Sequence, residues 1–389
     1  MITNDARVSM STGLPYCSAW IDAIAHHIGQ RFTREQARQH AKLYLKGLLS
    51  PIQRKNSRQL SESAGAATPY AIQHLLNRAV WDAEAVRDDL RDYVIARFGD
   101  PEALLVIGQQ GFIKRGDHSA GVQRQFNRFS GHTENCQIGV FLSYASKHGH
   151  AFIDRDLFLP QAWTDDQVRC RRAGIPDRRA FASKSELAKQ MIMRTLISSA
   201  PFSWITSTDE DCGNDARMHE WLESCQVPYL FPVDPACSTD ASLMAATLAL
   251  VDRLDARDWQ TEDASPSTHA HTPSQPPRWA RIEMPAAKYP QQRWLLIRKD
   301  RKKREKLTYF IVSAPCDSSL MKMVDIANQR NLIDEDFYAA NDFVGLDQYE
   351  VRNWIGWYRH VTLALLAFAA HKIPMPAQQY RSDVTSRSE

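Results

Sequence analysis

The stretch from Leu104 to Val233 carries the pattern that most limits how this chain can fold. Three apolar runs follow one another and are succeeded by helical segments that alternate with two further strand-like runs. The expected strands lie at 104–107, 137–144, 150–153, 202–206 and 228–233, and the expected helices at 184–198 and 215–224. Three adjacent strands followed by alternating helices and strands predict a mixed α/β sheet with helices packed on it.

The region before this sheet is predicted to be helical over 16–98, because apolar residues recur every three or four positions. A helical pair at 57–64 and 69–80 is joined by a short turn that contains Gly65. Its proportions, with Pro69 at a first helical position, resemble a helix-turn-helix. A helical bundle that binds no ligand explains the same pattern equally well.

The region after the sheet is less regular. A helix is expected at 243–254, a polar Pro/Ser-rich loop at 260–278, a β-hairpin at 294–298 and 307–313, and a largely helical end from 321 to 373. The resulting domain prediction has five parts. They are a helical, DNA-binding domain (1–98), the first part of the α/β core (99–255), a flexible loop plus β-hairpin insertion (256–318), C-terminal helices that complete the core (319–375) and a tail (376–389).

Composition sets broad limits on the class of protein. The 389 residues are 43% hydrophobic and 24% charged, with a net charge of +3, which is ordinary for a globular protein and too mild to indicate nucleic acid by itself. Seven scattered cysteines without a CxxC pair argue against a zinc ribbon and fit a reducing compartment. No signal peptide is recognised, and the longest apolar stretch, 361–370, is too short to span a bilayer. We therefore expect a cytoplasmic protein that does not associate with membranes.

Several long and unusual strings carry a family resemblance. They are GHTENCQIGVFLSYA (131–145), LPQAWTDD (159–166), GLDQYEVR (345–352) and WYRH (357–360). Over roughly residues 20–368 the chain resembles bacterial insertion-sequence transposases of the DDE class. The resemblance implies an RNase H-like mixed five-stranded sheet with flanking helices, an N-terminal helical domain and a small β insertion before the last catalytic helix. It also implies DNA cleavage and strand transfer, with three carboxylates holding two Mg²⁺ or Mn²⁺ ions.

The three carboxylate positions of that family can be matched in this chain. The first corresponds to Gly108 in VIGQQGF, where the family has Asp-Asp/Glu-Thr-Gly-Phe, and it is expected in a turn after the first strand. The second corresponds to Asp209, just past an expected strand. The third corresponds to Asp334, which replaces a Glu; the family Arg is kept as Arg330, and Glu335 is adjacent but lies about 100° away on a helix.

These changes bear on whether the chain can cut DNA. Glycine has no side chain to bridge two ions, Gln109 and Gln110 are neutral amides, and Asn341 stands where the family has Lys. We therefore predict a transposase-like DNA-binding protein without catalysis, which recognises DNA ends or acts as a transposase-derived regulator and needs no cofactor. The alternative is a functional or weakly active insertion-sequence transposase that uses Mg²⁺ or Mn²⁺ at Asp209 and Asp334. An unrelated nuclease or phosphatase on this fold would lack the carboxylates it needs.

Three groups of basic residues predict a surface for double-stranded DNA. The N-terminal cluster comprises Arg54, Lys55 and Arg58; the turn cluster comprises Lys114, Arg115, Arg124 and Arg128; the hairpin cluster comprises Arg298, Lys299, Arg301, Lys302, Lys303 and Arg304. A solvated hairpin tip is the plainer explanation of the last cluster, because charged tips are common. Association with the bacterial nucleoid follows from this prediction, and a homodimer is compatible with it.

Overall fold

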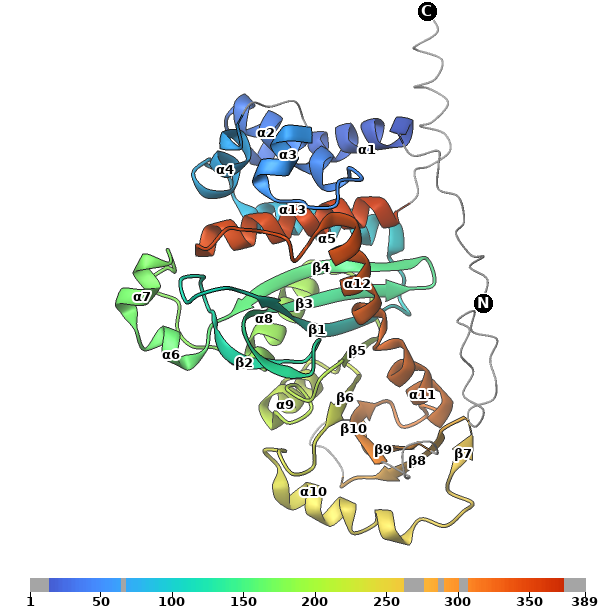
Figure 1. Ribbon diagram of the computed structural model, residues 1–389. Helices are drawn as coiled ribbons and strands as arrows, with labels where there is room; N and C mark the ends of the chain where they lie inside the picture. Colours follow the sequence, from blue (N-terminus) through green and yellow to red (C-terminus); the bar gives the residue numbers. More distant parts are fainter. Residues whose placement is uncertain (1–13, 64–67, 262–275, 286–289, 301–306, 374–389) are drawn as a thin grey trace, which may run out of the picture. The chain divides into compact units, whose positions relative to one another are not determined.

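The computed structural model describes residues 14–63, 68–261, 276–285, 290–300 and 307–373 (Figure 1). The chain forms two compact units. The helical unit comprises residues 1–92 and 339–389, and the sheet unit comprises residues 93–338. The helices α5 (Ala83–Phe98) and α12 (Leu332–Val344) each begin in one unit and end in the other.

The helical unit is built around one buried helix. Its elements are α1 (Leu14–His27), η1 (Gly29–Arg31), α2 (Glu35–Leu48), α3 (Ser57–Ser63), α4 (Tyr70–Asn77) and α13 (Trp354–Lys372). Every residue of α13 from Gly356 to Ala370 is buried, and the helix packs against α2 and α4. A helix that is apolar on nearly all sides needs such a central place, because no face of it is suited to water.

The predicted helical pair is present as α3 and α4. The buried Arg359 side chain binds backbone carbonyl groups at the end of α4. The guanidinium of Arg359, on α13, donates hydrogen bonds to the carbonyl oxygens of Leu75, Leu76, Ala79 and Trp81. These carbonyls lie at the end of a helix or just after it, where the backbone has no helical partner. Arg359 therefore fixes the direction in which the chain leaves α4.

The sheet unit contains one mixed sheet. Its strands among the described residues are β1 (Leu104–Ile113), β2 (Gln123–Asn127), β3 (His132–Ser146), β4 (Gly149–Phe158), β5 (Trp204–Ser207), β6 (Tyr229–Val233), β7 (Gln260–Thr261), β8 (Arg278–Glu283), β9 (Gln292–Lys299) and β10 (Leu307–Ala314). The order is β2-β3-β1-β5-β6-β10-β9-β8-β7, with β4 also paired to β3. The strands β1, β5 and β6 are parallel, whereas the other pairs are antiparallel.

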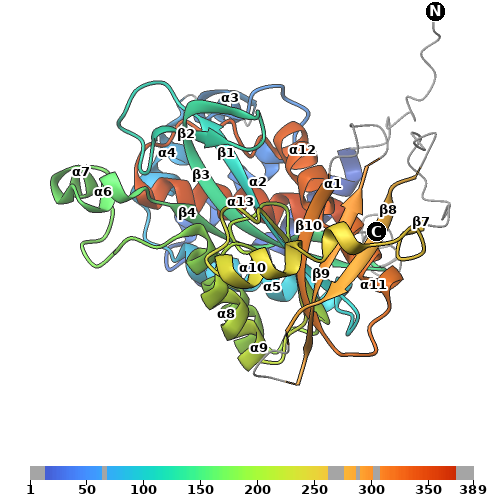
Figure 2. The same cartoon turned by 90° about the horizontal axis from the view of Figure 1, so that it is seen from below.

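Helices cover both faces of this sheet. The helix α8 (Lys184–Ile197) packs on β3 and β4, α11 (Leu320–Gln329) packs on β5, β6 and β8, and α12 contacts β3. The unit also contains α6 (Gln161–Thr164), α7 (Gln167–Arg172), α9 (Ala216–Ser224), α10 (Ala241–Leu248) and η2 (Val251–Arg253). Phe141 of β3 contacts Phe337 of α12, whereas Asp154, which lies opposite Leu142, bonds to Arg194 of α8. Neighbouring residues of a strand point to opposite faces, so α12 and α8 lie on opposite sides. Figure 2 shows α8 and α9 together.

The predicted mixed α/β architecture is confirmed, and the sheet extends beyond the five expected strands. The expected core is β4-β3-β1-β5-β6. The strand β10 pairs antiparallel with β6, and β9, β8 and β7 continue outward (Figure 1). The predicted hairpin is thus part of the main sheet, because the free edge of β6 offers unpaired backbone groups. Most of the predicted polar loop at 260–278 lies outside the described residues.

The expectation of a turn at Gly108 is wrong. The strand β1 continues to Ile113, and Gly108 lies in its middle, directly opposite Phe141 of β3. The pairing with β3 supplies hydrogen bonds to a segment whose Gly-Gln-Gln-Gly sequence has low strand propensity. Separately, none of the helices in the described ranges is both long and apolar enough to cross a membrane.

Candidate functional site

The first matched position, Gly108, faces an apolar surface of α12. A Cβ atom built on Gly108 would lie 2.9 Å from Cγ2 and 3.0 Å from Cδ1 of Ile333, and 3.3 Å from Cε2 of Phe337. These separations are shorter than ordinary van der Waals contacts. A side chain at position 108 would therefore require Ile333 to shift.

The second matched position, Asp209, follows the end of β5. Ile107 of β1 pairs with Ser207 of β5, and the amide of Thr208 donates to the carbonyl of Ile107, so Asp209 comes next to the middle of β1. Its side chain is buried, at 7% exposure. Burial, and then the nearby Asp211 carboxylate, raise the pKa of Asp209 to about 7. Near neutral pH this carboxyl group is therefore divided between its protonated and ionised forms.

The opposite face of β1 carries polar contacts that the sequence did not reveal. Gln109 points away from α12 and donates from Nε2 to Oδ2 of Asp211 at 3.3 Å. Lys184, the first residue of α8, approaches the same oxygen at 3.2 Å. Neither Lys184 nor Asp211 belongs to the matched family positions. On this face a neutral amide and an ammonium both approach the Asp211 carboxylate.

The third matched position, Asp334, is held by an arginine. Nη1 of Arg128, in the loop after β2, lies 3.1 Å from Oδ1 and 3.3 Å from Oδ2 of Asp334. Arg128 was predicted to contact DNA, and nothing in the sequence linked it to Asp334, since 206 positions separate them. Glu335, the adjacent acid, is exposed to solvent.

Two further arginines gather near this ion pair. Arg330 lies over the ring of Phe310 at 5.0 Å, and Arg298 lies over the ring of Trp279 at 5.8 Å. Burial, followed by the positive charges of Arg298 and Arg128, lowers the pKa of Arg330 to about 10. Three guanidinium groups therefore share one region of the sheet unit.

The convergence predicted for the three positions is supported by neighbouring contacts. Gly108 lies against Ile333, the residue before Asp334. The positive charge of Arg128, which pairs with Asp334, lowers the pKa of Asp209 against the larger effect of burial. The donor set, however, does not fit a two-metal site. The first position has no side chain, Asp209 is easily protonated, and Asp334 is already paired with a cation. Within the described ranges, no three His, Cys, Asp or Glu side chains are grouped so that they could hold a metal ion.

The structure corrects one member of the N-terminal cluster. Lys55 is buried, and its ammonium donates at 2.5 Å to the carbonyls of Leu48 and Ser50, at the end of α2. Its role is to satisfy helix-terminal carbonyls, so the predicted phosphate contact is wrong for this residue. Arg54 is exposed, and Arg58 is exposed but pairs with Glu62 at 2.8 Å.

The turn cluster lies wholly within the described residues, and the hairpin cluster only in part. In the turn cluster, Arg115 and Arg124 are exposed and Lys114 is half-buried. In the hairpin cluster, Arg298 and Lys299 lie at the end of β9. The remaining members, Arg301, Lys302, Lys303 and Arg304, lie outside the described residues.

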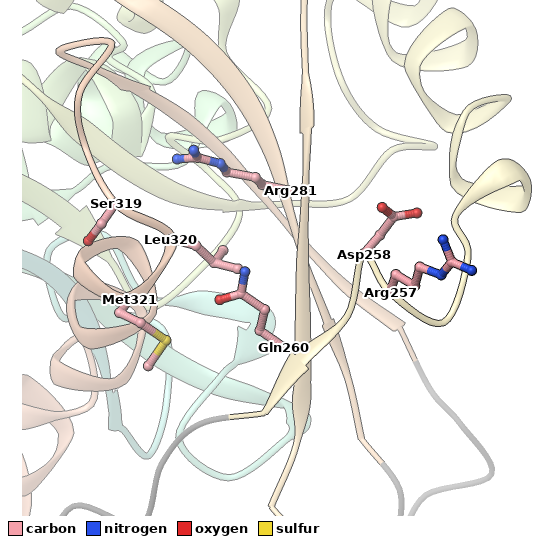
Figure 3. A pocket seen from close by; sticks show the side chains of 7 residues that line it. All are labelled: Arg257, Asp258, Gln260, Arg281, Ser319, Leu320 and Met321. Atoms are coloured by element: carbon pink, nitrogen blue, oxygen red, sulfur yellow. The ribbon is translucent and has the colours of Figure 1, made fainter.

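A pocket of about 470 Å³ lies elsewhere in the sheet unit (Figure 3). Its lining includes Arg257 and Asp258 from the loop before β7, Arg281 from β8, and Ser319 and Met321 at the start of α11. None of the matched carboxylate positions lines it, and Arg281 is already bonded to the Ser318 carbonyl. The pocket therefore shares no residue with the three matched positions.

Comparison with known proteins adds the family. No curated protein sequence matches the chain significantly. The sequence model of a family described as DDE superfamily endonuclease matches residues 27–294. This range contains Gly108 and Asp209 and most of the sheet, and it ends before Asp334. Endonucleases of this family act on DNA, generally with Mg²⁺ or Mn²⁺. With its mixed α/β sheet and its matching sequence, the chain belongs to the DDE superfamily of endonucleases.

Proposed function

We propose that this protein is a DNA-binding member of the DDE superfamily that does not cleave or join DNA. The observation that carries the proposal is the packing of Ile333 against Gly108, since a side chain at position 108 would require Ile333 to shift. The chemistry of the class needs carboxylates that hold two ions on the attacking and leaving oxygens. Losing the bridging ligand removes much of the electrostatic stabilisation of the transition state.

The DNA-binding part of the proposal rests on the family and on charge. Exposed basic residues remain at Arg54, Arg115 and Arg124, none of which depends on the missing carboxylate. Phosphate contacts made by such residues give affinity without base specificity. We propose recognition of DNA ends, or regulation of a related recombinase, as the purpose that survives loss of cutting. A bacterial, nucleoid-associated setting and a homodimer belong to the same proposal.

The test is a paired assay on the full chain. A labelled duplex oligonucleotide is incubated with the protein and Mg²⁺ or Mn²⁺, and both binding and nicking are measured. We expect salt-sensitive binding without nicking or strand transfer. Metal-dependent cutting that disappears in the Asp209→Asn variant would instead support the alternative of a functional or weakly active transposase. Light scattering of the free and DNA-bound protein decides the oligomeric state.

A further inference from the structure

The ion pair between Arg128 and Asp334 lies where a metal-dependent relative would need a free carboxylate. Both oxygens of Asp334 are within 3.3 Å of Nη1 of Arg128. The side chains are 29% and 24% exposed, so the pair is open to solvent on one side. A guanidinium with five N–H donors keeps donors free after it has bound one carboxylate. Arg128 can therefore hold a second anion while it remains anchored by Asp334.

Two neighbouring guanidinium groups are placed for an acceptor that the described residues do not supply. Arg298 and Arg330 are each supported by an aromatic ring, and within the described part of the chain their buried Nε atoms have no hydrogen-bond partner. Trp279, which is 1% exposed and supports Arg298, likewise has an indole N–H without a partner among those residues. All of these unsatisfied atoms are donors, and buried donors without acceptors are costly.

The balance of charge indicates the same kind of ligand. The strongest charged neighbours of Arg330 are the cations Arg298 and Arg128 and the anions Asp334 and Glu210, and their net effect together with burial is a lowered pKa of Arg330. The cations Arg298 and Arg128 act on Arg330 more strongly than the anions Asp334 and Glu210 do. A phosphodiester carries one negative charge and offers two oxygens that match the guanidinium fork.

We propose that Arg128, anchored by Asp334, replaces a divalent ion in this site and binds one phosphodiester of a nucleic-acid strand. The inference rests on the proposed function for the identity of the ligand, because nucleic acid is the substrate class of the family. It goes further in naming the site and in making its binding independent of metal. It involves no bond formation or cleavage.

The experiment is a salt titration of the full chain with a fluorescently labelled duplex oligonucleotide, followed by anisotropy. It is performed with EDTA and with Mg²⁺ at matched ionic strength, for the unmodified protein and for Arg128→Gln, Arg128→Lys and Arg217→Gln. Arg217 is an exposed arginine of α9 in the same unit and serves as the matched control. We expect binding in EDTA that is at least as tight as in Mg²⁺, and a slope of log K against log salt that is smaller by about 0.9 for Arg128→Gln.

The control variants separate charge from geometry. Arg217→Gln should leave the slope unchanged, and Arg128→Lys should keep the slope but lower affinity, because a lysine has no planar fork. Far-ultraviolet circular dichroism and thermal melting confirm that each variant is folded. An unchanged slope and affinity in Arg128→Gln, or binding that requires Mg²⁺, would overturn the inference while leaving DNA binding intact. If the unmodified chain fails to bind DNA at all, the proposed function falls and the inference falls with it.

Discussion

Gly108 of β1 packs against Ile333 of α12: a Cβ atom on Gly108 would come within 2.9 Å of Cγ2 of Ile333. The glycine at the first matched position is thus packed tightly against the helix that carries the third matched position, Asp334. Restoring the family residues at 108, 334 and 341 would therefore place a charge against an apolar surface. The contact gives the proposed absence of catalysis a packing reason in addition to the missing ligand.

Gly108→Asp should lower the free energy of unfolding by about 1–3 kcal/mol, because Ile333 must shift and a carboxylate is buried. Urea denaturation measures this change, and a nicking assay with Mg²⁺ should stay negative. The double variant Gly108→Asp, Ile333→Ala should be more stable than the sum of the two single effects predicts, because Ile333→Ala supplies the missing space. A Gly108→Asp protein as stable as the parent would contradict this account of the contact.

The contribution of Asp209 to the stability of the protein should fall as the pH rises from about 4 to about 7. Its pKa is near 4 in the unfolded chain and about 7 in the folded one, so the folded state binds more protons between those values. The stabilisation is complete below pH 4 and is lost as the pH passes through 7. Asp209→Asn should flatten this dependence and stabilise the protein at pH 8, by an amount on the order of a few kcal/mol. Urea denaturation at pH 5.5 and 8, with the exposed Asp317→Asn as control, provides the measurement.

Arg54 and Lys55 are neighbours in sequence but should respond differently to replacement. Arg54→Ala removes an exposed charge and should reduce the salt slope of DNA binding by about 0.9 if it touches phosphate. Lys55→Met should leave that slope unchanged and lower stability by about 1–3 kcal/mol, because two helix-terminal carbonyls lose their donor. Anisotropy titrations and urea denaturation on the same preparations separate the two effects. A lower slope in Lys55→Met at unchanged stability would place its ammonium at the DNA after all.

Arg359 should be the most sensitive cation of the helical unit. It is 7% exposed and donates to four carbonyls around the end of α4. Arg359→Met should cost about 2–4 kcal/mol of unfolding free energy, since several buried acceptors lose their donor at once. Arg359→Lys should recover only part of this loss, because an ammonium cannot reach all four carbonyls with the same planar geometry. Chemical denaturation tests both variants, with the exposed Arg352→Met as the control.

The sequence predicted those strands whose residues are nearly all apolar. The buried segments Leu104–Ile107 and Tyr229–Val233 were recognisable as strands, because nearly all their residues are apolar. The second half of β1 was not, since Gly108–Gly111 has no strand signal of its own and depends on pairing with β3. The strand β8 was missed because Trp279, Ala280 and Ile282 follow a Pro-rich stretch that suggested a loop.

The candidate site was predictable only where a motif fixed the position. The strings around Gly108 and Asp209 placed these residues next to each other once β1 and β5 were known to be parallel. The pairing of Arg128 with Asp334 joins residues 206 positions apart and follows from the tertiary fold alone. Burial of Lys55 was equally invisible, because a lysine beside Arg54 and Asn56 is ordinarily solvated.

The pairing of β10 with β6 has a consequence for how the chain is made. Val233 of β6 pairs with Tyr309 of β10, so everything between them must leave the ribosome before β6 acquires its outer neighbour. Until then β6 (Tyr229–Val233) is an edge strand with unpaired backbone groups, although all five of its residues are buried in the folded protein. Borders of this kind join other chains edge to edge when they persist. Truncation anywhere between β6 and β10 should therefore yield aggregates rather than a smaller folded nuclease-like core.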